Sequence, residues 1–177
     1  KAIWLRSTRD IKDEEYTEFY KHVTNDWNEP LDKIHYRAEG KQEFSALIYI
    51  PGAVPYDYNQ RDMKYGPSLY VKRVFITDNC EELVPQYLRF VKGVVDSNDL
   101  PLNVSRELIQ KDREINLISK ALVSKLLRHF KGMLSKKRES YLKLWELFGS
   151  TLKEGIASDV ANKDTLTDLA LFRTSEN

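Results

Sequence analysis

A chain of 177 residues with 41% hydrophobic and 11% aromatic residues can bury a substantial core, so a disordered chain is excluded as the default interpretation. Its 28 basic and 27 acidic residues give a formal charge of +1, which offers no overall electrostatic argument for binding nucleic acid or an anionic membrane. Cys80 is the only cysteine, which excludes an intrachain disulfide and favours a reducing compartment.

From this sequence we expect neither a membrane-spanning segment nor a signal peptide. No apolar run approaches the roughly 18 to 20 residues that cross a bilayer, and the first residues lack the apolar stretch of a signal peptide. The sequence does not begin with methionine, and both ends fall within a structured pattern. We therefore expect a piece cut from a longer protein.

The first half of the chain predicts a helix followed by a hairpin. Apolar side chains recur at helical spacing over residues 12–23, which is typical of an amphipathic helix. Apolar and polar residues then alternate over residues 34–38 and 44–50, which predicts two strands. The intervening residues 39–42 contain a glycine and favour a hairpin turn.

A long loop and further strands follow. Residues 51–67 are polar and rich in tyrosine, with proline and glycine at both ends, and predict a loop. A third strand is expected over residues 69–76 and another over residues 93–96. Between them, residues 81–90 predict a short helix broken near Pro85.

The last third of the chain has a helical pattern. Ser105 is expected to cap a helix that begins at Arg106. Apolar residues keep helical spacing over residues 115–133, and a second apolar stripe over residues 141–148 is expected to end at Gly149.

These elements predict an α+β protein in two parts. Residues 1–112 are expected to form an α/β/α sandwich with a mixed sheet, and residues 113–177 a helical subdomain packed against it.

The sequence lacks the common complete motifs for nucleotide, metal and nucleophile sites, which argues against an independent catalyst. The three histidines are isolated in the sequence, so we expect structural roles for His22, His35 and His129. Cys80 has acidic neighbours, which oppose a reactive thiolate.

Two features leave alternatives open. A basic cluster suits phosphate contact, but a solvated helical face explains it better because no aromatic residues interleave with it; its members are Lys125, Arg128, Lys131, Lys136, Lys137 and Arg138. Trp4 lies in a polar setting, where it either packs on the first helix or serves as an exposed anchor for a protein partner.

The most informative segment covers residues 93–110, where a strand runs through a proline-containing loop into a helix. The loop places Arg106 between two amide side chains, Asn103 and Gln110. A guanidinium offers a rigid fork of donors for a phosphate oxygen, and the amides can fix the loop around it.

This loop and several other segments together resemble the middle domain of the 90-kDa heat-shock chaperone family. The resemblance extends over essentially the whole chain, in the family's order; the other segments are residues 2–4, 14–20, 69–76, 87–97 and 169–173. It implies a sandwich like the second domain of ribosomal protein S5, lying between an N-terminal ATP-binding domain and a C-terminal dimerisation domain.

The resemblance also implies roles for particular residues. Arg106 would reach the γ-phosphate of ATP held by the N-terminal domain, and Asn103 and Gln110 would belong to the same catalytic loop. Phe75 and Leu100 would pack beneath that loop. Trp4 would contact client proteins or cochaperones.

As cofactors, the resemblance implies ATP and Mg²⁺, bound mainly by the N-terminal domain and not by this fragment. The whole protein would be a homodimeric ATPase that assists folding of unfolded or partly folded clients, whereas the isolated chain would not be an enzyme. Binding of nucleic acid or membrane is not expected. Residues 39–43 and 56–66 look most like bacterial members, which favours a cytoplasmic bacterial chaperone. The alternatives are an interaction scaffold and a nucleic-acid-binding module, both without a link to ATP.

Overall fold

The fold is built around one mixed sheet. The computed structural model describes residues 1–171, apart from the side chain of Arg106. Five strands form the sheet in the order β1-β2-β5-β3-β4, with β5 in the centre. The strands are β1 (Asp32–Ala38), β2 (Phe44–Ile50), β3 (Ser68–Val71), β4 (Val74–Thr77) and β5 (Lys92–Ser97). Only β3 and β5 run parallel, and the other neighbours are antiparallel, so the predicted mixed sheet is confirmed.

Both faces of the sheet are covered, as the burial of β2 shows. All seven residues of this strand are buried. Ala46 and Ile48 pack into the larger buried cluster, whereas Leu47 and Tyr49 pack into a smaller one on the opposite face. Because successive side chains of a strand point to opposite faces, a strand that is buried throughout requires a layer on each side.

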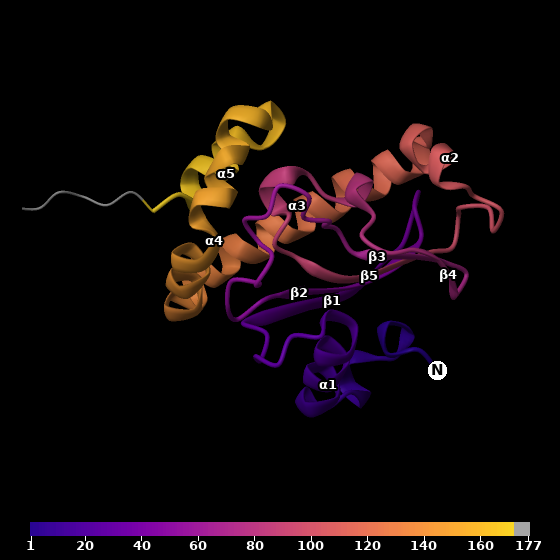
Figure 1. The fold of residues 1–177 in the computed structure, drawn as a ribbon, viewed down its shortest axis with the longest axis horizontal. Helices are drawn as coiled ribbons and strands as arrows, with labels where there is room; N and C mark the ends of the chain where they lie inside the picture. The colour runs from indigo at the N-terminus through magenta and orange to yellow at the C-terminus, as the bar shows by residue number, and fades with distance from the viewer. Residues whose placement is uncertain (172–177) are drawn as a thin grey trace, which may run out of the picture.

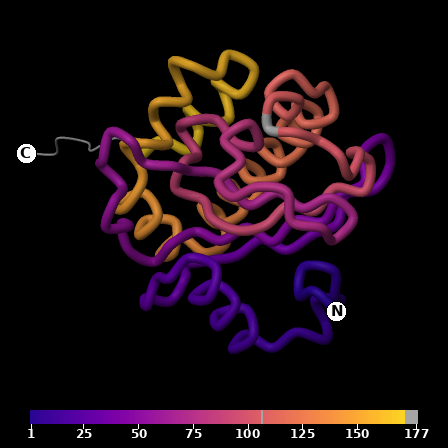
Figure 2. The backbone as a smooth tube through the Cα atoms, turned by 45° about the vertical axis from the view of Figure 1, so that its right-hand side comes forward, coloured from indigo at the N-terminus to yellow at the C-terminus, as the bar shows by residue number. Residues whose placement is uncertain are grey.

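The smaller layer consists of the amino-terminal segment (residues 1–12) and α1 (Asp13–Thr24). Figures 1 and 2 show both on one face of the sheet, with the larger group of helices on the other. The Glu15 carboxylate accepts a hydrogen bond from the Lys12 backbone N–H at 2.8 Å, which satisfies a free amide at the start of α1. Asn25, with φ of 56°, ends the helix in the left-handed conformation.

The larger layer contains the helices α3 (Arg113–Lys136), α4 (Arg138–Ser158) and α5 (Lys163–Leu169). The Asp112 carboxylate caps α3 by accepting hydrogen bonds from the amides of Glu114 and Ile115. These helices and the sheet share one buried cluster. The boundary at residue 112 stays a prediction, and the fold class with its helical C-terminal part is confirmed.

One predicted strand is wrong. Residues 69–76 form two strands, β3 and β4, connected by a tight turn at Lys72 and Arg73. Both turn residues have positive φ, 48° and 69°, a conformation that glycine or asparagine usually supplies. Residues 69–76 contain no glycine or asparagine, so two short strands joined by a turn could not be distinguished from one continuous strand in the sequence.

Two helix boundaries also differ. Instead of ending at Gly149, α4 continues to Ser158, because Gly149 does not adopt the positive φ with which a glycine ends a helix. A Cβ atom at this position would come within 2.6 Å of the Trp145 ring. This glycine serves close packing and not termination. Residues 81–90 form two short 3₁₀ turns, Glu81–Leu83 and Gln86–Leu88, on either side of Pro85. Within residues 1–171, no helix has both the length and the apolar character needed to cross a membrane.

Candidate functional site

The predicted phosphate-binding loop leaves the carboxyl end of the central strand. Residues 98–105 connect β5 to α2 (Arg106–Lys111), and Asp112 then begins α3. The loop is therefore held by the sheet at one end and by the long helix at the other. Figure 1 shows α2 on the same side of the sheet as α3, near the end of the sheet where β4 lies.

Ser97 fixes the first residues of the loop. Its side chain is fully buried, and its hydroxyl oxygen accepts hydrogen bonds from the amides of Asp99 and Leu100, each at 3.2 Å. On one side, the Asp99 carboxylate accepts from the Glu43 amide at 2.8 Å, and the Asn98 amide donates to the Glu43 carbonyl at 3.0 Å. The hairpin between β1 and β2 thus holds the loop's base.

The turn between β3 and β4 holds the other side. The Lys72 amide donates to the Ser97 carbonyl at 2.9 Å. The Arg73 amide donates to Asp96 Oδ1 at 3.2 Å, and the indole N–H of Trp4 donates to Asp96 Oδ2 at 2.8 Å. The amino-terminal segment and the turn between β3 and β4 therefore converge on Asp96 and Ser97, the two residues that precede the loop.

Apolar side chains anchor the loop from below, while its polar side chains face outward. Leu100, Val104 and Ile109 are buried. Asn103 and Gln110 are exposed, so their amides are accessible to a group brought from outside. The burial of Leu100 agrees with its predicted structural role.

Arg106 begins α2, and its side chain lies outside the described residues. The Ser105 hydroxyl caps this helix as predicted, by accepting a hydrogen bond from the Leu108 amide at 3.3 Å. The structure thus places Asn103 and Gln110 on the same exposed loop and short helix as the Arg106 backbone. The contact of Arg106 with a phosphate stays a prediction.

Phe75 does not lie buried beneath the loop, contrary to the prediction. Its side chain is 51% exposed and meets the Tyr70 ring at 5.5 Å between centroids. The physical reason is its position on β4, the outermost strand, beyond which no further strand covers the sheet edge.

Of the two alternatives for Trp4, the structure shows the buried one, and its contact with client proteins or cochaperones stays a prediction. Its side chain is only 9% exposed, and its ring packs against Phe19 and Tyr70, with centroids 5.9 and 4.7 Å away. The alternative of packing on the first helix is the observed one. With its indole N–H bonded to Asp96, Trp4 is part of the smaller core layer.

Within residues 1–171, the most exposed aromatic residues are Trp27 and Tyr56, which the sequence pattern did not single out. Trp27 is 90% exposed and Tyr56 is 97% exposed, and both line a cavity of about 530 Å³. Asp26, Asp57 and Lys92 also line it, and burial lowers the pKa of Lys92 although the two carboxylates oppose the shift. The available signal was the polar surroundings of Trp27 just after the first helix.

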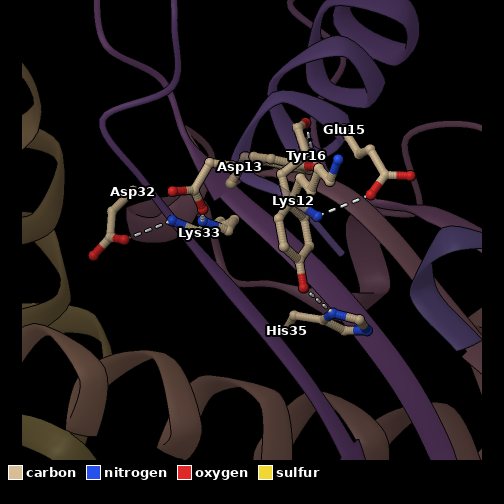
Figure 3. A network of polar contacts seen from close by, with 8 residues as sticks. Lys12, Asp13, Glu15, Tyr16, Asp32, Lys33 and His35 are labelled. Atoms are coloured by element: carbon tan, nitrogen blue, oxygen red, sulfur yellow. Dashed lines mark hydrogen bonds and ion pairs between the residues drawn. The ribbon is translucent and has the colours of Figure 1, made fainter. Parts of the chain in front are cut away.

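His35, His129 and Cys80 have structural surroundings, as predicted, whereas His22 is exposed near the end of α1. Figure 3 shows the Tyr16 hydroxyl directed at the His35 ring, 2.7 Å from Nδ1. His129 Nε2 lies 2.8 Å from Asp32 Oδ2. Burial, reinforced by the Glu82 carboxylate, raises the pKa of the Cys80 thiol to about 12, which opposes a reactive thiolate. The described part of the chain contains no group of three or more histidine, cysteine or acidic residues arranged to hold a metal ion.

Comparisons with known proteins identify the family of the chain. The family described as "Hsp90 protein" matches residues 1–177. Chaperone protein HtpG of Bdellovibrio bacteriovorus is 56% identical over 177 residues, which cover this whole chain and 28% of that protein. Chaperone protein HtpG of Geobacter sulfurreducens is 55% identical over 175 residues, or 99% of this chain and 27% of that protein.

A solved structure is also similar. The middle domain of a heat-shock protein from Plasmodium falciparum superposes with a TM-score of 0.84 at 29% sequence identity, covering 96% of this chain and 66% of that chain. The present chain thus spans about 28% of the length of the curated relatives that it matches.

Proposed function

Because this chain belongs to the Hsp90 protein family, we propose that it serves as the middle part of an ATP-dependent molecular chaperone and supplies Arg106 to a nucleotide held by another domain. The observation that carries this proposal is the loop after β5. Its base is fixed by buried hydrogen bonds, whereas Asn103 and Gln110 face outward.

Such a loop suits transition-state stabilisation. As the γ-phosphoryl group leaves, negative charge redistributes over its oxygens, and a guanidinium held there stabilises the transition state more than the ground state. An arginine on a mobile chain would lose much of this effect, because placing it would cost conformational entropy during the reaction. The pinned base of the loop supports that role for Arg106.

ATP and Mg²⁺ would be bound mainly outside this chain. The amide donors of Asn103 and Gln110 fit phosphate oxygens, which only accept hydrogen bonds. Within the described residues, however, no acidic or histidine cluster fits a metal ion. The isolated chain is therefore expected to show no hydrolysis, and the complete protein is expected to be an ATPase.

Replacing Arg106 by alanine in the complete protein tests the proposal. ATP turnover should fall on the order of 10-fold to 1000-fold, as for other deletions of a single donor, while ATP affinity changes only slightly. Lys111→Ala is the matched control, because it removes a positive charge from the other end of the same helix. Gln110→Ala should have a smaller effect than Arg106→Ala, since glutamine carries no charge. Normal single-turnover hydrolysis by a folded Arg106 variant would refute the assignment.

We further propose that the cavity beside Trp27 and Tyr56 contacts unfolded or partly folded clients. Two nearly fully exposed aromatic side chains support this, because such residues are costly to leave in water and serve as anchors at protein interfaces. Trp27→Ala in the complete protein should weaken client binding by about 1 to 2 kcal/mol without lowering the melting temperature. The control is Val160→Ala, because Val160 is 83% exposed and lies outside this cavity. Unchanged client affinity in the Trp27 variant would count against this surface.

The remaining properties are proposed on the family relationship alone. They are a homodimer formed through a C-terminal domain, contact with cochaperones, and action in the cytoplasm. A nucleic-acid-binding role predicts affinity that falls steeply with salt, because it would depend on phosphate contacts. We expect no such binding in a titration of labelled single-stranded and duplex nucleic acid.

A further inference from the structure

We propose that Asp96 is a positioning residue that ties the amino-terminal segment to the loop carrying Arg106, so that the bond between Trp4 and Asp96 sets how fast ATP turns over. The catalytic part of this inference rests on the proposed function. Its structural part, that Asp96 holds the loop, stands on the geometry of the chain.

Asp96 occupies an unusual place for a carboxylate. It lies on the central strand, is 2% exposed, and shares its sheet face with Val94, a member of the smaller apolar cluster. Burying a charged group is costly unless hydrogen bonds compensate for its lost hydration. Each oxygen of Asp96 accepts one, from the Trp4 indole and from the Arg73 amide.

These two donors come from segments far apart in the sequence, and the carboxylate offers each of them its own acceptor oxygen. An apolar residue at this position would pack as Val94 does but would bind neither donor. An asparagine keeps one oxygen and replaces the other by a donor nitrogen. The Asp96 carboxylate therefore joins two segments of the chain, which an apolar side chain that only fills the core could not do.

The Trp4 end of this link is itself fixed. Phe19 and Tyr70 pack against the indole ring. His35 Nε2 lies 2.9 Å from the Trp4 carbonyl oxygen, and since a carbonyl only accepts, this nitrogen carries the proton. The Tyr16 hydroxyl then donates to Nδ1 of the same ring (Figure 3). A shift of the amino-terminal segment would thus displace the indole N–H of Trp4 and change its hydrogen bond to Asp96.

The Asp96 end leads directly into the loop. The next residue, Ser97, binds the Lys72 amide through its carbonyl and the amides of Asp99 and Leu100 through its hydroxyl. The turn that supplies the Lys72 and Arg73 amides has positive φ at both residues without a glycine. Such a turn is held by its surroundings, so losing the Asp96 acceptor should loosen the turn and the loop base together.

The test uses the complete protein with Trp4→Phe and Asp96→Asn. The first variant keeps an aromatic ring but loses the indole donor, and the second keeps the shape but loses one acceptor. Tyr20→Phe is the matched control, because it removes a hydrogen bond to Asp26 from the same smaller layer without involving Trp4 or Asp96. Amide hydrogen exchange of residues 98–104 reports on the loop, and steady-state ATP hydrolysis gives kcat and KM separately.

Both test variants should increase exchange in residues 98–104 and lower kcat on the order of 10-fold with KM within about 2-fold, because a small misplacement of a catalytic group acts on the transition state. Tyr20→Phe should do neither. Exchange and kcat equal to those of the control would overturn the inference; where Arg106→Ala does lower turnover, a change in only one of the two quantities would overturn it as well. If Asp96→Asn does not fold, Trp4→Phe decides.

Arg106→Ala, measured alongside, separates this inference from the proposed function. Normal turnover in that variant would remove the proposed role of Arg106. The hydrogen exchange of residues 98–104 would then decide alone whether Asp96 holds the loop.

Discussion

Replacing Phe90 by alanine tests whether the sandwich and the helical part form a single folding unit. Phe90 precedes the predicted boundary at residue 112, yet it is fully buried against two rings that follow the boundary. Its ring lies 4.6 Å from that of Phe148, with an angle of 5° between the planes, and 6.2 Å from that of Phe130. The same stack meets Tyr58, from the long loop, at 5.5 Å.

The expected cost follows from this burial. Removing a fully buried phenylalanine side chain lowers the free energy of unfolding by about 3 to 5 kcal/mol, through lost burial and the cavity left behind. For a chain of this size, that loss corresponds to a melting temperature lower by about 6 to 20 °C. Phe75→Ala is the matched control, because the same atoms are removed from a site that is 51% exposed, and it should cost less than half as much.

Urea unfolding followed by two probes distinguishes one unit from two. Far-ultraviolet circular dichroism follows mainly the helices, and fluorescence in a background with both Trp27→Phe and Trp145→Phe follows Trp4 on the opposite face of the sheet. If the shared cluster makes unfolding cooperative, both probes should shift together in Phe90→Ala. A shift in the helical signal alone, with the Trp4 transition unchanged, would refute the reasoning and support two independent parts.

Three further predictions concern buried polar groups. Cys80 should resist alkylation at neutral pH in the native state and react quickly once urea unfolds the chain, because burial raises its pKa to about 12; rapid native labelling would contradict this. Burial alone would raise the pKa of Asp159, but hydrogen bonds, with that from Tyr87 the largest, hold it below its ordinary value. A carboxylate with a lowered pKa stabilises the fold above its unfolded pKa, so Tyr87→Phe should reduce stability most above about pH 5 and least below about pH 3; a difference that does not vary with pH would exclude this linkage. Tyr49→Phe removes a buried hydrogen bond of 2.8 Å to the Tyr16 carbonyl and should cost about 0.5 to 1.5 kcal/mol in chemical denaturation; no measurable loss would show that the carbonyl finds another donor.

The sequence predicted the elements whose signal is local. Helical spacing placed the first helix at residues 12–23, and the structure has it at Asp13–Thr24. Alternation located β1 and β2, and the glycine-containing segment between them forms the expected hairpin. Each of these signals arises within a few residues of the chain, because helix and strand periodicity reflect which face of one element is buried.

The candidate site was predictable in part. The order of strand, proline-containing loop and capped helix placed Asn103, Arg106 and Gln110 on one segment, and Ser105 does cap α2. The hydrogen bonds that fix the loop could not be predicted, because Glu43, Lys72 and Asp99 meet only when separate strands pair.

What the sequence by itself determined was the class of fold, the family resemblance and the identity of the loop, because these depend on patterns that one stretch of chain carries alone. The tertiary structure decided what covers each tryptophan: Trp4 is covered by Phe19 and Tyr70, whereas Trp27 stays 90% exposed. It likewise decided that Asp96 is paired with the Trp4 indole, 92 positions away. Burial and pairing are properties of surfaces that meet across the fold, so no single stretch of the chain determines them.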